Sequence, residues 1–181
     1  MKNLIEEWVV ETTKAKGPFK GFLGWLSRGP KDIQVTLPAY DFLRAEVFVM
    51  DLKRVEDLDD FDVHDLFVLL LEDFVYHIRL DAELPELLEN LKERFERVKS
   101  VRAVRREKRV KDNFITITVA LEHETILRTQ VLLRDLFELD QDFSVQIEDL
   151  LKVLVVDLVH ELKRGSGKKY ARAIMDHLER E

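Results

Sequence analysis

Two carboxylate–imidazole pairs are the residues of this chain whose types and spacing could do chemistry. Asp73 and His77 lie four residues apart in one apolar segment, and Asp157 and His160 lie three apart in another. If both segments are helices, each pair projects from one helix face, as metal ligands do in helical bundles. The two histidines do not occupy equivalent positions in their segments, and helical spacing alone specifies a site weakly. We therefore interpret them as partly exposed histidines and predict no metal site.

Other signatures of catalysis or cofactor binding are missing from the sequence. The chain has no cysteine, which excludes disulfides, thiolate metal sites and a cysteine nucleophile. The glycines of segment 17–24 follow no predicted strand and lack the Gly-Lys-Ser/Thr ending of a phosphate-binding loop. None of the four serines lies in a Gly-x-Ser-x-Gly turn. These absences favour a non-catalytic protein without a cofactor.

Large apolar side chains crowd into segment 19–26, between Gly17-Pro18 and Gly29-Pro30, with basic residues around them. Aromatic side chains flanked by cations suit a loop that docks into a partner's groove or onto a membrane surface. The alternative is a linker whose aromatic rings cover the end of the core. On the first interpretation the candidate partner-binding residues are Phe19, Phe22 and Trp25.

Basic residues concentrate in segment 92–111, which holds ten of them against three acidic residues and so carries a net charge of +7. Lysine and arginine side chains that neutralise phosphates give nucleic acids a salt-sensitive affinity. The segment lacks the stacking aromatic residues of single-strand binders, and a solvated helix end is the plainer interpretation. The candidate nucleic-acid-binding residues are Arg102, Arg105, Arg106, Lys108, Arg109 and Lys111.

The sequence contains an internal repeat, and each copy of it would form elements that position these residues. Residues 32–78 align with residues 116–162 without a gap, at a constant offset of 84, and thirteen positions are identical. The polar identities are Arg44/Arg128, Asp51/Asp135, Asp65/Asp149 and Asp73/Asp157. An internal repeat requires each copy to build the same unit and the two units to pack together.

Each copy opens with an alternation of apolar and β-branched residues, at 32–37 and at 114–119, which predicts a half-buried strand. A second alternation follows in each copy, at 43–49 and at 127–133. We interpret these segments as second strands that complete two β-hairpins. A helix is the competing interpretation, because neither segment contains a strong breaker.

The segments 63–78 and 147–162 have apolar residues at helical spacing, and Asp60 and Ser144 are predicted to be their N-caps. Their apolar arc is wider than one face, so we expect both helices to be buried on more than one side. Further helices are expected near Leu4, over 84–95, and over 168–178 after the glycine break at 165–167.

The predicted fold is therefore α+β: a helix–β-hairpin–helix unit used twice, whose hairpins merge into one four-stranded antiparallel sheet with helices mainly on one face. Residues 1–83 form the first repeat and 84–181 the second, around a shared core. Arg44 and Arg128 would lie on the open sheet face, together with Gln34, Thr36, Thr118 and Gln130, as a twofold ligand surface.

Composition completes the functional prediction. The chain of 181 residues is 46% hydrophobic and 36% charged, with a net charge of −7, which disfavours a protein that coats nucleic acid over its whole surface. The acidic start lacks the features of a signal peptide, and the apolar runs are too short to cross a bilayer. We predict a cytoplasmic protein-interaction or regulatory protein, with nucleic-acid binding as the alternative. The wide apolar arcs of the central helices are also compatible with a homodimer.

Overall fold

The computed structural model describes residues 29–56, 58–78, 83–107 and 113–178. Within these residues the chain is mostly helical, with one two-stranded sheet, and the element types are broadly α+β as predicted. In chain order the elements are β1 (Lys31–Pro38), α3 (Ala39–Glu56), α4 (Val63–Asp73), η1 (Phe74–Ile78), α6 (Leu84–Glu107), β2 (Phe114–Leu121), α7 (His123–Leu139), α8 (Ile147–Lys163) and α9 (Gly167–Leu178). Strand, helix, helix is thus the order that occurs twice, at the offset of the sequence repeat.

The sheet takes one strand from each copy. β1 and β2 pair in antiparallel fashion, and Gln34 lies opposite Thr118, its own counterpart 84 residues later. An antiparallel pair in which equivalent residues face each other has a local twofold axis through that pair. Along both strands buried and exposed residues alternate, so one face of the sheet is covered and the other is open. On the open face the hydroxyl oxygens of Thr36 and Thr116 lie 3.0 Å apart.

The predicted four-stranded sheet is wrong, because the segments expected to be second strands are helices. Residues 43–49 lie in α3 and residues 127–133 lie in α7. In α3 the inward side chains are Ala45 and Val49, one turn apart, whereas Leu43 and Val47 point outward, also one turn apart. Two apolar pairs on opposite helix faces, offset by two residues, produce a false period of two.

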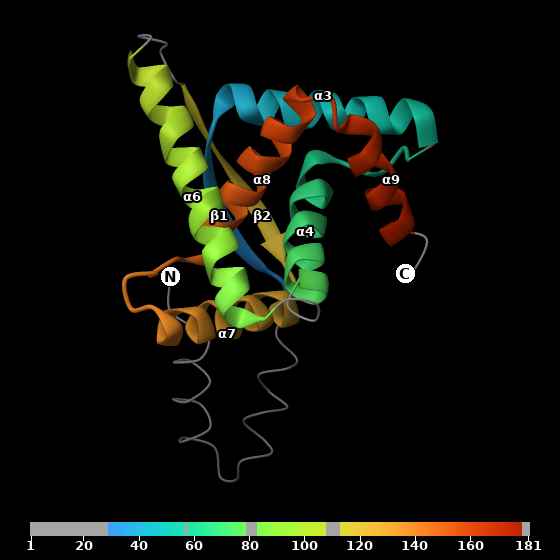
Figure 1. Ribbon diagram of the computed structural model, residues 1–181. Coiled ribbons are helices and arrows are strands. Elements are labelled where there is room, and N and C mark those ends of the chain that lie inside the picture. The colour runs from blue at the N-terminus through green and yellow to red at the C-terminus, as the bar shows by residue number, and fades with distance from the viewer. Residues whose placement is uncertain (1–28, 57, 79–82, 108–112, 179–181) are drawn as a thin grey trace.

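The central helices interlock the two copies. α8, from the second copy, packs against β1 of the first, while α4, from the first copy, packs against β2 of the second (Figure 1). α4 and α8 also pack against each other. These contacts with the strands and between the two helices bury the wide apolar arcs. Leu69, Leu71, Val153, Val155 and Val159 all lie in one hydrophobic cluster. The breadth of these arcs therefore needs no second chain to explain it.

The remaining helices frame this centre. α3 runs across one end of the molecule and α7 across the opposite end, while α6 lies along one side (Figure 1). α6 continues to Glu107, so the described part of the basic segment is helical rather than a linker. The carboxylate of Asp157 on α8 forms ion pairs with Arg94 and Arg97 of α6, at 3.3 and 3.7 Å. These ion pairs hold α6 against α8.

The ends of the helices differ from the predicted caps. The N-cap of α4 is Asp62 rather than Asp60, and it forms a reciprocal capping box with Asp65. The N-cap of α8 is Gln146 rather than Ser144, without a side-chain cap. α8 ends at Lys163 with Arg164 as its C-cap, and the next residue, Gly165, has a φ of 90°, in the left-handed region that favours glycine. The predicted terminal helix is confirmed as α9.

The cap of α4 gives a prediction about acid stability. Burial pushes the pKa of the Asp62 carboxyl upward, but the N–H groups of Asp65 and His64 donate to it and hold the net pKa below its ordinary value. A depressed pKa stabilises the fold above the unfolded-state pKa, and that contribution is lost as pH falls through the folded-state pKa. We expect Asp62→Ala to cost about 1 kcal/mol of unfolding free energy at pH 7.

The cost should begin to shrink below about pH 4, where the carboxyl of the unfolded chain takes up a proton, and should keep falling as pH passes through the lower pKa of the folded state. Urea unfolding of the parent chain and Asp62→Ala at pH 7 and pH 3 measures this difference. Asp62→Asn, which keeps an oxygen acceptor, is the control that retains most of the cap. An equal cost of Asp62→Ala at both pH values would contradict the role assigned to the charged carboxylate.

Candidate interaction surface

The largest concentration of exposed apolar side chains among the described residues lies on one face of α3. Tyr40, Leu43, Val47 and Met50 are 53–57% exposed. Their spacing of three, four and three residues places them within an arc of about 80° on the helix. We call these four residues the α3 stripe. Isolated apolar residues on a surface are ordinary, but a continuous row on one helix face is typical of a surface that receives a partner.

The second copy of the repeat serves as an internal control for this stripe. The equivalent positions of α7 are Glu124, Leu127, Val131 and Arg134. The two charged residues stand where α3 has Tyr40 and Met50, and the two apolar ones are half-buried. The architecture therefore does not require an exposed apolar row on this helix. The α3 stripe is a property of the first copy alone.

Charged residues border the α3 stripe on both sides. Arg44 and Asp51 lie seven residues apart along one border, and Glu46 and Lys53 lie seven apart along the other. The Arg44 guanidinium stands 5.1 Å from the centre of the Tyr40 ring and donates to the Tyr40 hydroxyl at 2.9 Å. Two contacts to one side chain hold Tyr40 and Arg44 in a fixed relation.

A second cation supports the same end of the stripe from α8. The Lys163 ammonium lies 5.4 Å from the centre of the Tyr40 ring and 3.3 Å from a carboxylate oxygen of Asp41. Asp41 is buried, so this ion pair ties the first turn of α3 to the last turn of α8. Tyr40 is thus exposed and yet contacted by two cations, which limits the conformational entropy that it would lose on binding.

An open hollow of about 520 Å³ adjoins the Arg44 border of the stripe. It lies between α3 and the junction of α8 with α9. Its lining residues are Tyr40, Leu43, Arg44, Val47, Phe48, Asp51, Leu162 and Gly167. The hollow offers space for side chains of a partner, and its volume is in the range of small-molecule sites. Its lining is apolar except at Arg44, Asp51 and the Tyr40 hydroxyl, a composition suited to contact rather than to acid–base catalysis.

The predicted twofold surface of Arg44 and Arg128 does not form on the sheet. Arg44 lies on α3 and Arg128 on α7, at opposite ends of the molecule (Figure 1). Arg128 pairs with Glu124 at 2.6 Å and stands 4.5 Å from the centre of the Tyr76 ring. Burial raises the pKa of Tyr76, an effect that the positive charge of Arg128 opposes. Of the two arginines, Arg44 borders the α3 stripe and Arg128 does not.

The candidate aromatic residues Phe19, Phe22 and Trp25 lie outside the described residues, as do Lys108, Arg109 and Lys111. The backbones of Arg102, Arg105 and Arg106 belong to the last turns of α6. Earlier in the same helix, Lys92, Arg94, Arg97 and Lys99 each form an ion pair with an acidic side chain. These four basic residues at the start of the segment are thus paired within the protein.

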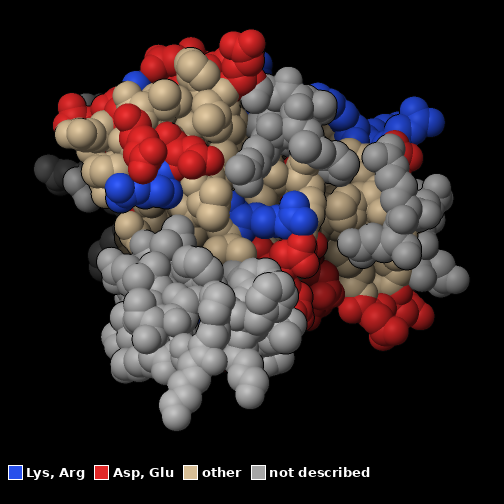
Figure 2. Space-filling model, turned by 90° about the horizontal axis from the view of Figure 1, so that it is seen from below, with Lys and Arg blue, Asp and Glu red and all other residues tan. Residues whose placement is uncertain are grey.

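Charge on the end that carries α7 is mixed. Acidic side chains gather there in several groups, with basic side chains beside them (Figure 2). The described part of this face therefore presents no continuous basic surface of the kind that follows a phosphate backbone.

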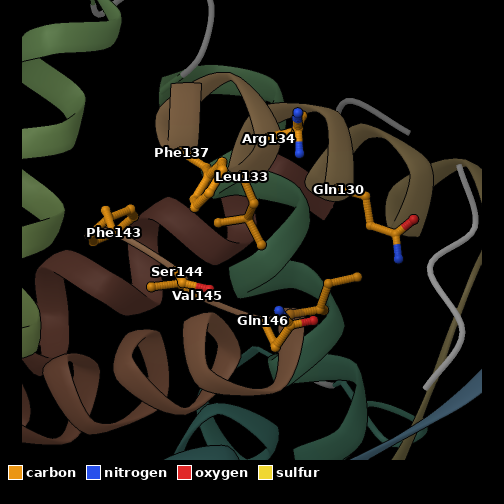
Figure 3. A pocket seen from close by; sticks show the side chains of 9 residues that line it. Gln130, Leu133, Arg134, Phe137, Phe143, Ser144, Val145 and Gln146 are labelled. Carbon is orange, nitrogen blue, oxygen red and sulfur yellow. The ribbon is translucent and has the colours of Figure 1, made fainter. Parts of the chain in front are cut away.

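A second hollow lies between α7 and the segment that precedes α8 (Figure 3). It has a volume of about 210 Å³, below the usual range of small-molecule sites. Its polar groups include Gln130, Gln146 and Arg134, and the last of these pairs with Glu138 at 3.0 Å. In the portions of the chain that the structure describes, no three His, Asp or Glu side chains converge as a metal site would require. None of the described helices combines the length and apolar character needed to cross a bilayer.

Comparison with known proteins adds no assignment. No known family matches the chain, and neither the curated proteins nor the solved structures contain a match to it. The candidate surface therefore stands on its geometry.

The sequence contained a signal for the α3 stripe that the strand interpretation hid. Positions 40, 43, 47 and 50 follow the spacing of a helical contact seam, and the comparison of the two copies marks 40 and 50 as divergent. If residues 39–56 form a helix, the buried residues Ala45, Val49 and Leu52 fall on one face and the α3 stripe falls on the opposite face.

The division of α3 into two faces predicts opposite effects of substitution. Met50 is exposed, so we expect Met50→Gln to change the unfolding free energy by less than about 0.5 kcal/mol. Leu52 is buried on the same helix, and Leu52→Ala should cost about 2–5 kcal/mol. Urea unfolding at protein concentrations near 1 μM, where association is least, is the measurement. A cost of 2 kcal/mol or more for Met50→Gln would mean that the stripe belongs to the core.

Proposed function

We propose that the protein is a non-catalytic, cytoplasmic interaction protein that binds a partner protein through the α3 stripe. The observation that carries this proposal is the difference between the two copies. A duplicated helix carries an exposed apolar row in one copy, but in the other copy two of the four equivalent positions are charged and the other two are half-buried. Exposed apolar rows favour aggregation, so their retention in one copy is best explained by a partner that covers them.

The chemistry of the surface agrees with this role. Interface cores are enriched in tyrosine, methionine and arginine and depleted in lysine and acidic residues, whereas interface borders are polar. The α3 stripe has tyrosine and methionine at its two ends, with Arg44 and Asp51 beside it. Tyr40 is positioned in advance by Arg44 and Lys163, as is common for residues that dominate binding energy.

Nucleic-acid binding through segment 92–111 is the second candidate. It is supported by the net charge of +7 and by the continuation of α6 through Glu107, which presents a basic helix. The ion pairs of Lys92, Arg94, Arg97 and Lys99 weaken this candidate, since paired cations release fewer counterions. Titration of labelled RNA and DNA at about 50 and 200 mM salt separates the two proposals.

Site-specific photo-crosslinking tests the proposed function. A benzophenone amino acid at position 50 places the reactive group on the α3 stripe, and the same group at position 134 places it on the equivalent site of α7. We expect protein adducts from position 50 well in excess of those from position 134, with the full chain in its native cell extract. Adducts of equal and low yield at both positions would contradict the proposal.

A further inference from the structure

The first copy of the repeat contains an arginine that lacks the carboxylate partner of its counterpart. In the second copy Arg128 donates from Nε and from Nη2 to one carboxylate oxygen of Glu124, at 2.9 and 2.6 Å. The equivalent arginine is Arg44, and Tyr40 stands where the second copy has Glu124. Arg44 donates from Nη2 to the neutral Tyr40 hydroxyl at 2.9 Å, while its Nε is buried and has no acceptor among the described residues. The same two nitrogen atoms are therefore paired with a carboxylate in one copy only.

Arg44 is also the less exposed of the two arginines. It is half-buried, whereas Arg128 is exposed. A charged group that is partly withdrawn from water is costly unless an opposite charge or hydrogen bonds compensate it. Across the described ranges of the chain, no carboxylate forms an ion pair with Arg44. An external carboxylate would therefore supply at Arg44 the interaction that Glu124 supplies at Arg128.

We propose that the hollow beside Arg44 is a binding site for a small organic monocarboxylate. Its volume of about 520 Å³ is in the range of small-molecule sites. Arginine and carboxylate groups form short, charge-assisted hydrogen bonds, frequently two at once, and a guanidinium offers five N–H donors, of which Arg44 uses one on Tyr40. The carboxylate of the ligand pairs with Arg44. The apolar body of the ligand lies against the apolar part of the wall, which consists of Leu43, Val47, Phe48 and Leu162.

Asp51 restricts the ligand to one anionic group. It lines the same hollow, seven residues after Arg44 and so about 10 Å farther along the axis of α3. It is exposed, and it forms no ion pair with Arg44. Its negative charge repels a second anionic group of any ligand that extends along α3. The hollow therefore favours a carboxylate at the Arg44 end with an uncharged body over a dicarboxylate or a chain of phosphates.

Basic residues on the α8–α9 side add a positive potential around the hollow. Segment 163–172 contains five basic residues and no acidic one. Two of the five form ion pairs with acidic side chains elsewhere in the chain. The other three follow Gly167, which lines the hollow, and all are exposed: Lys168, Lys169 and Arg172. Exposed cations beside a cleft raise the local concentration of anions and so increase their rate of binding.

Octanoate and phenylacetate are suitable probes, because each joins one carboxylate to an apolar body, aliphatic in the first and aromatic in the second. Titration of the full chain, followed by ¹H–¹⁵N NMR, should show saturable one-to-one binding of at least one probe, with a dissociation constant on the order of 1 mM or below. The amide signals that shift should belong to residues that line the hollow. Octanol and octylamine keep the apolar chain of octanoate without its carboxylate, and they should bind at least about tenfold more weakly.

The difference between the two copies provides the sharpest variant. Tyr40→Glu gives Arg44 the intramolecular carboxylate that Arg128 has, so it should weaken binding of the probe at least about tenfold. Tyr40→Gln is the matched control, because it removes the same ring without adding a charge. It should bind the probe at least about tenfold more tightly than Tyr40→Glu does. A role of the Tyr40 ring in shaping the hollow would affect both variants alike.

Two arginine variants test the positive charge itself. Arg44→Gln should lower the affinity for the probe at least about tenfold. Arg128→Gln, at the equivalent position of α7, should leave the parental affinity unchanged. A far-ultraviolet circular dichroism spectrum equal to that of the parent chain shows that a variant is folded. If Arg44→Gln does not fold, the comparison of Tyr40→Glu with Tyr40→Gln decides the question.

The outcomes separate this inference from the proposed function, on which it does not rest. Probe binding that Tyr40→Glu blocks and Tyr40→Gln retains supports the carboxylate site, whatever the crosslinking at position 50 shows. Three results would overturn the site: no saturable binding of either probe up to about 10 mM, equal affinity for octanoate and octanol, or binding that Tyr40→Glu leaves intact. Adducts at position 50 report on the α3 stripe alone, because Met50 does not line the hollow.

Discussion

The pairing of β1 with β2 is the interaction on which the rest of the structure depends. These strands belong to different copies of the repeat, and Gln34 meets its own counterpart Thr118 at the local twofold axis. An isolated two-stranded sheet is marginal in water, so it needs helices on one face. α8 and α4 supply that cover in crossed fashion, each over the strand of the other copy. Neither copy has a complete core alone, and the repeat therefore gives one domain with one hydrophobic cluster.

The first strand and the long central helix of each copy could be predicted from the sequence because each has one clear periodicity. Ile33, Val35 and Leu37 alternate with exposed residues, and α8 repeats apolar residues at helical spacing. The segment 43–49 misled the prediction for a physical reason. Its inward residues fix the fold, and its outward residues Leu43 and Val47 belong to the candidate binding surface. The surface supplied the extra apolar residues that turned a helical pattern into an apparent strand.

Local rules fail most often at functional sites, and α3 departs from one such rule. A helix of a single-domain protein normally keeps polar residues on its outer face. α7 keeps charged residues at the two ends of the equivalent row, whereas α3 presents Tyr40 and Met50 there. The sequence alone could not show which apolar residues of α3 would remain exposed outside the core. That depends on the crossing of α4 and α8, which fills the interior without using the outer face of α3.

Cysteine pairs across the sheet test the interlocked arrangement most directly, because the chain has no cysteine of its own. Residues directly opposite in an antiparallel pair have Cα atoms about 4.5–5.5 Å apart, within the span of a disulfide. Gln34→Cys with Thr118→Cys should therefore oxidise rapidly to an intrachain disulfide in the folded protein. Thr36→Cys with Ala120→Cys, four residues out of register on the same open face and about 13 Å apart, should not. Equal oxidation of both pairs, or of neither, would contradict the pairing of the two copies through β1 and β2.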